Sequence, residues 1–141
     1  LVGRRTPRAG ELAWALRRFE LAGERLSAAE ALTDVLLALR ALLEPEGPHS
    51  GRLAARVSAL CAVPEQRAAV AERVAHCADL ERAVIAGVGP DEQTLQGLVD
   101  GLSAQLRALL RDVLCGHLDS DLRSVADGLL AEQETSEAPA P

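Results

Sequence analysis

The clearest folding signal in this chain lies at residues 27–44, which read SAAEALTDVLLALRALLE. Leucine and valine recur there at spacings of three and four residues, which predicts an amphipathic helix from Ala28 to about Glu44. Ser27 and Glu30 have the spacing of a capping box, in which the two side chains accept hydrogen bonds from each other's backbone N–H groups. The stretch therefore predicts a helix with a defined start.

The same helical periodicity recurs on both sides of this stretch. Further helices are expected at about 11–26, 52–62, 64–86 and 121–132, with another that begins within 89–92 and runs to about 118. Residues that favour strands are scarce, since the chain has a single Phe and no Tyr. We expect an all-α fold, a single helical bundle of five to six helices over residues 11–132. A flexible lead-in (1–10) and a disordered tail (133–141) should flank it.

Composition limits the classes of partner. The formal net charge of −6 does not support RNA binding, although RNA remains possible, because a non-specific nucleic-acid binder normally shows a basic face. No apolar run approaches the roughly 20 residues that a membrane span needs, so no membrane partner is expected. The chain lacks methionine and begins with Leu1, and we expect it to belong to a longer polypeptide.

The three cysteines are an odd number without CxxC spacing, which is typical of reduced thiols in a cytoplasmic protein. Cys61, Cys77 and Cys115 are expected to serve as small core residues. Trp14 is expected as a core anchor, with a place in an interface as the alternative. The chain has no phosphate-binding glycine loop, no paired-His metal motif and no nucleophile elbow. No cofactor and no metal are expected.

Glu81 is a charged residue among the apolar residues of the 64–86 helix. On a helical wheel Val70, Val74, Cys77, Val84 and Val88 share one stripe, and Glu81 lies in its middle. A lone buried carboxylate is costly, so Glu81 should be protonated, paired, or turned toward a cleft or second subunit. Alternatively the helix is rotated and Glu81 reaches solvent at a packing edge.

Two other groups of side chains could carry chemistry. The opposite face of that helix carries Glu72, His76 and Asp79. The two carboxylates could raise the pKa of the histidine, or the three side chains could contribute to a metal site. Alternatively, they form an ordinary solvated surface. Cys115 and His117 could join His76 or Cys77 around zinc, although no standard zinc spacing is present.

The middle of the chain resembles the HEPN superfamily, in particular its Apea-like branch. The resemblance rests on segments in the same order over roughly residues 11 to 115. These segments are residues 13–19 (AWALRRF), 37–43 (LALRALL), 51–60 (GRLAARVSAL), 64–67 (PEQR) and 79–87 (DLERAVIAG).

The resemblance implies a helical bundle whose members often dimerise, and many active members are metal-independent ribonucleases. Their R-x4-6-H motif supplies a histidine for proton transfer and an arginine that steadies phosphate charge. Counting back from Gly87, this chain has Ala86 at the histidine position and Glu81 at the arginine position, with Arg82 one residue out of place. Arg40 stands where Apea-like members usually have Glu, so Arg40 and Glu81 could form a pair with exchanged charges.

We therefore expect a non-catalytic, HEPN-like helical domain for dimerisation or partner binding within a larger cytosolic protein. Glu81, Arg82, Ala86 and Gly87 would line the remnant motif cleft. The alternatives are a metal-independent ribonuclease that uses Arg82 with His76 or His117, and an unrelated helical protein-interaction domain.

Overall fold

A computed structural model describes residues 9–25, 27–47, 50–119 and 121–137 of the chain. Within these residues the chain forms six α-helices and no strand, which confirms the predicted all-α bundle. The elements are α1 (Ala9–Glu24), α2 (Ala28–Leu43), α3 (Leu53–Cys61), a short 3₁₀ turn η2 (Pro64–Gln66), α4 (Arg67–Ile85), α5 (Glu92–Leu114) and α6 (Leu122–Glu137). None of these helices has both the length and the apolar character that crossing a bilayer would require.

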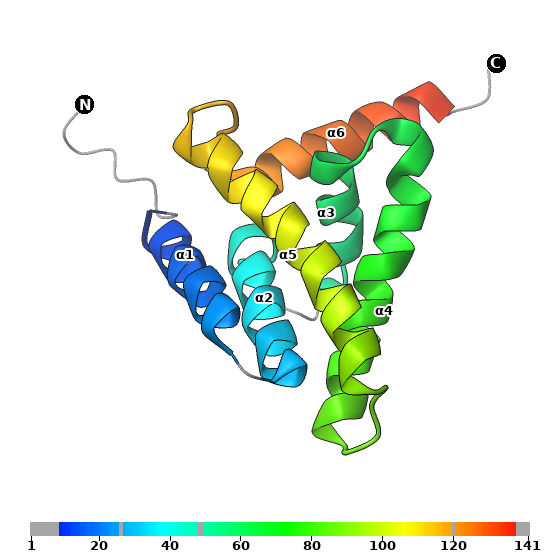
Figure 1. The fold of residues 1–141 in the computed structure, drawn as a ribbon. Helices are drawn as coiled ribbons and strands as arrows, with labels where there is room; N and C mark the ends of the chain where they lie inside the picture. The colour runs from blue at the N-terminus through cyan, green and yellow to red at the C-terminus, as the bar shows by residue number, and fades with distance from the viewer. Residues whose placement is uncertain (1–8, 26, 48–49, 120, 138–141) are drawn as a thin grey trace.

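α2 is the centre of the bundle and contacts each of the other five helices (Figure 1). Its leucines are spaced so that several faces of the helix are apolar, and Leu32, Leu36, Leu39 and Leu43 are fully buried. α1 and α5 pack on α2 directly, whereas α4 and α6 pack mainly on α3. The stretch with the clearest periodicity in the sequence is thus the helix around which the core forms.

A buried carboxylate fastens α1 to α2. Asp34 of α2 is buried and accepts hydrogen bonds from Arg18 Nη1 at 3.1 Å and Arg25 Nε at 2.8 Å. The hydrogen bond and charge of Asp34 raise the pKa of Arg25 further above its ordinary value. A buried carboxylate is tolerated here because two cations bind it.

The start of α2 differs from the predicted capping box. Ser27 makes no side-chain cap, and the Ala28 N–H instead donates to Glu92 Oε1 at 2.7 Å. Glu30 lies 3.5 Å from Arg25 Nη1. The capping-box prediction is therefore wrong, because a carboxylate from the first turn of α5 satisfies the free N–H and ties the two helix starts together.

Several expected limits and positions also need correction. α6 continues to Glu137, so the prediction of disorder is wrong for residues 133–137, and Ala9 and Gly10 belong to α1 rather than to a lead-in. The other residues of those two predicted segments, 1–8 and 138–141, lie outside the described part of the chain. Trp14 is exposed on the outer side of α1, under the Arg18 guanidinium, and Cys115 is exposed at the end of α5. Trp14 lies on the side of α1 that faces away from the bundle, whereas Cys115 is the C-cap residue that follows the last residue of α5.

Candidate functional site

Glu81 lies on the buried side of α4, as the helical wheel predicted. The buried residues of this helix are Val70, Val74, Cys77 and Glu81, which follow one another at spacings of four, three and four. Only 8% of the surface of Glu81 is exposed. The regular spacing places a carboxylate against the bundle where an apolar side chain would ordinarily sit.

The structure brings Arg40 and Glu81 together. Arg40 Nη1 donates to Glu81 Oε1 at 3.0 Å, and the Arg40 side chain is 24% exposed. Arg40 stands in the last turn of α2, where a cation also interacts favourably with the helix dipole. The ion pair joins α2 to α4 across 41 residues of sequence, and the geometry is that of a neutralised carboxylate in a packing interface.

The other three positions of the remnant motif do not converge on Glu81. Arg82 is exposed and its Nη2 donates to Asp79 Oδ1 one turn earlier on the same helix. Ala86 is the exposed C-cap of α4, and Gly87 follows with a φ of +82°, the left-handed conformation predicted for a helix end. Of the four residues expected to line one cleft, Arg82 alone lines the pocket described next.

A pocket of about 260 Å³ opens between α3, α4 and the end of α2. Small apolar side chains, among them Leu53, Val74 and Ala78, form part of its wall. Charged side chains of both signs complete the wall, namely Arg40, Arg82, Glu44 and Asp79. The guanidinium groups of Arg40 and Arg82 are matched by carboxylates, so the pocket offers phosphate no unpaired cation.

The two histidines of the ribonuclease alternative lie on separate elements. His76 is exposed on α4, and His117 is exposed in the turn after α5, with its Nδ1 3.9 Å from Asp112 Oδ1. In the described ranges, no three His, Cys, Asp or Glu side chains gather closely enough to hold a metal ion. Cys77 is buried and Cys61 half-buried, and burial is the main cause that raises the pKa of both thiols, that of Cys61 to about 11.

The apolar stripe of α4 leaves the core beyond Val84, which is partly buried and still packs against it. Ile85 is 78% exposed and Val88 is 71% exposed. Both residues belong to the connection where α4 ends and the chain turns back into α5. This connection projects from the rest of the bundle (Figure 1). Exposed aliphatic side chains on either side of Ala86 and Gly87 form an apolar tip, which we define as Ile85 and Val88.

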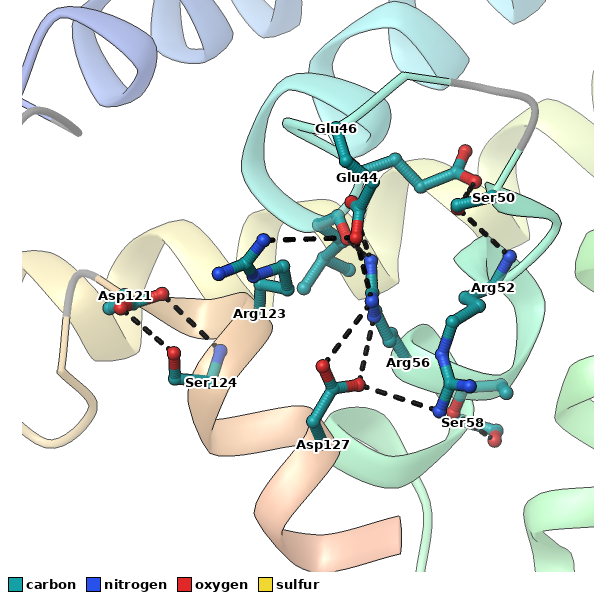
Figure 2. A network of polar contacts seen from close by, with 12 residues as sticks. Glu44, Glu46, Ser50, Arg52, Arg56, Ser58, Asp121, Arg123, Ser124 and Asp127 are labelled. Atoms are coloured by element: carbon teal, nitrogen blue, oxygen red, sulfur yellow. Dashed lines mark hydrogen bonds and ion pairs between the residues drawn. The ribbon is translucent and has the colours of Figure 1, made fainter.

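A larger charged cluster, which the sequence did not reveal, joins α3 to the loop after α2 and to α6. Arg56 of α3 is buried and donates to both oxygens of Glu46, to both oxygens of Asp127, and to the Leu43 carbonyl oxygen. Figure 2 shows this guanidinium between the loop that follows α2 and the first turns of α6. These contacts raise the pKa of Arg56, and hydrogen bonds from Arg56 lower the pKa of Glu46 to about 2.

The position of Arg56 in the sequence pattern of α3 could have identified it as a buried residue. It stands three residues after Leu53 and four before Leu60, on the side of α3 that was expected to face inward. Its partners could not be read from the sequence, because Asp127 follows 71 residues later on another helix.

No family model, no curated protein and no solved structure matches this chain.

Proposed function

We propose that this chain is a non-catalytic, HEPN-like helical module of a cytosolic protein that acts through contacts with other protein surfaces. The observation that carries the proposal is the Arg40–Glu81 pair. The position at which the resembling ribonucleases hold a phosphate-binding arginine is here a carboxylate, 8% exposed and bound to α2. A residue used in this way joins two helices and offers RNA phosphate no cation.

The remaining groups at the site support the same proposal. Ala86 has no atom that could transfer a proton, and the Arg82 guanidinium lies against Asp79. The apolar tip, Ile85 and Val88, is the surface beside the remnant motif that is best suited to contact with protein. Since HEPN domains often dimerise, we propose a second copy as the first partner to test. Reduced cysteines agree with a cytosolic location.

The proposal is tested by combining sedimentation velocity with a ribonuclease assay on the purified chain. We expect the chain to self-associate as its concentration rises. Ile85→Glu and Val88→Glu should each weaken this association by about tenfold or more, because burying a charged side chain at an interface is costly. Val63→Glu, a charge placed at another exposed aliphatic position, is the matched control and should leave the association unchanged.

RNA cleavage provides the independent measurement. Structured and unstructured RNA should both remain intact in metal-free buffer. Reproducible cleavage that His76→Ala or His117→Ala abolishes would replace this proposal with the ribonuclease alternative. A chain that stays monomeric at all concentrations would remove the second copy as the partner.

A further inference from the structure

A groove separates α1 from α5 on the side of α2 opposite to α4. Both helices pack on α2, but their contact with each other is much smaller (Figure 1). The groove has a volume of about 280 Å³ near the C-terminal end of α5. Leu16 and Phe19 of α1 and Leu110 and Leu114 of α5 form its apolar lining. Leu114 is 61% exposed, so a large aliphatic side chain here has no covering partner among the described residues.

Arg107 and Arg111 stand one turn apart on α5 along the same groove. The Arg107 guanidinium lies 5.7 Å from the centroid of the Phe19 ring. Neither arginine makes a hydrogen bond or ion pair with a carboxylate in the described part of the chain. Most other described arginines do make such a contact. Those with a carboxylate partner are Arg18, Arg25, Arg40, Arg52, Arg56, Arg82 and Arg123.

Among the described residues Arg17, Arg67 and Arg73 also lack a carboxylate partner, but Arg107 and Arg111 stand one turn apart and both border the apolar groove. An occupant that covered Leu114 and also brought carboxylates to Arg107 and Arg111 would satisfy both features. Arginine binds carboxylates through paired hydrogen bonds, which favours an acidic occupant over a neutral one.

We propose that this groove binds an amphipathic helix of a partner protein, with apolar residues on one face and Asp or Glu along the flank next to α5. The groove is open to solvent and not enclosed, which suits a helix better than a small molecule that needs enclosure. Its lining follows α1 for about one turn, from Leu16 to Phe19, and α5 for about two turns, from Arg107 to Cys115. Apolar anchors of the bound helix at positions i, i+3 or i+4 would therefore contact the apolar lining of both helices. The proposal concerns a surface separate from the apolar tip and does not rest on the proposed function.

A display library of amphipathic helices tests the proposal with the whole chain as target. Apolar positions are varied among aliphatic and aromatic residues, and each flanking position is either Glu or Lys. We expect the enriched helices to carry Glu on one flank. Leu114→Glu and the double variant Arg107→Glu/Arg111→Glu should each weaken their binding by at least tenfold. Val63→Glu and Arg73→Glu, which change exposed residues elsewhere, are the matched controls and should bind as the wild type does.

A charge exchange distinguishes electrostatic recognition from simple burial. Helices in which the enriched Glu residues are replaced by Lys should bind the double variant better than they bind the wild type. Thermal unfolding of each variant, followed by circular dichroism, shows that it remains folded.

Three results would overturn the proposal. One is an enriched set without acidic preference, and another is binding that Leu114→Glu leaves unchanged. The third is failure to enrich any helix. If that failure accompanies self-association that Leu114→Glu abolishes, a second copy occupies the groove. If no helix is enriched and the chain instead binds phosphatidylglycerol vesicles, with Leu114→Glu abolishing that binding, a membrane surface occupies the groove.

Discussion

Arg56 and Arg40 lie on adjacent helices and both bind carboxylates, yet they are held very differently. Arg56 is 3% exposed, and each of its three guanidinium nitrogens donates at least one hydrogen bond. Arg40 is 24% exposed and makes one hydrogen bond, to Glu81, among the described residues. A buried cation is tolerated when every donor is satisfied, whereas a partly exposed pair leaves some donors to water.

The two sites also differ in what they connect. Arg56 links the end of α2, the loop after it and α6 to its own helix, so four segments meet at one guanidinium (Figure 2). Arg40 and Glu81 link two helices. The comparison indicates that the Arg56 cluster ties several segments of the bundle together, while the Arg40–Glu81 pair joins α2 to α4 alone.

The largest effect is expected for Arg56→Met, which retains an apolar chain of similar length and removes the charge. Glu46, Asp127 and the Leu43 carbonyl would lose their shared donor, so we expect the free energy of unfolding to fall by about 3–5 kcal/mol. Urea denaturation followed by far-UV circular dichroism measures this loss. Arg52→Met is the matched control, since Arg52 is half exposed and its Nη2 lies 3.7 Å from the same Asp127. A loss of similar size in both variants would contradict a special role for Arg56.

A smaller but more informative effect is expected for reversing the Arg40–Glu81 pair. Arg40→Glu and Glu81→Arg each place like charges side by side, and we expect each to destabilise the fold by about 2 kcal/mol or more. The double variant restores opposite charges and should recover about 1 kcal/mol or more of the summed loss. Urea denaturation of all four proteins completes the cycle. Strictly additive losses would show that the two side chains are not coupled.

The pH dependence of stability provides a measurement specific to the Arg56 cluster. Hydrogen bonds from Arg56 lower the pKa of Glu46 from its ordinary value of 4.5 to about 2 in the folded chain. The ionised form of Glu46 therefore stabilises the fold fully above pH 4.5, and this stabilisation is lost as the pH falls toward 2. Urea midpoints measured across this range should decline less steeply in Glu46→Gln than in the wild type. Equal slopes would contradict the lowered pKa of Glu46.

The sequence predicted the helices well because their apolar periodicity is local. Helix α2 begins at Ala28 and Glu81 falls on the buried side of α4, both as the spacing indicates. The partner of Glu81 was suggested by the family resemblance, since periodicity alone does not relate residues on two helices. Asp127 and Glu92 act on residues far away in the sequence, so their roles depend on packing that no local pattern encodes.

Trp14 and Ile85 show the same limit for apolar side chains. Trp14 was expected inside and is exposed, because Ala15 and the half-buried Leu12, Leu16 and Phe19 supply the packed side of α1. Ile85 flanks the apolar stripe of α4 in the sequence but lies past the point where that helix packs against the core. Periodicity identifies an apolar stripe, and only the tertiary structure determines how much of it is covered.

The smallest effect is expected for Arg82→Ala, one residue from Glu81. The Arg82–Asp79 pair is exposed, and surface pairs of this kind contribute about 0–1 kcal/mol, so the free energy of unfolding should change by less than about 0.5 kcal/mol. Arg73→Ala, another exposed arginine on α4, is the matched control in the same urea experiment. A small loss at Arg82 beside a large one at Glu81 would mean that, of these two neighbours, only Glu81 contributes to the packing of α4 against α2. A loss above about 1 kcal/mol at Arg82 would instead show that both neighbours were recruited to stability.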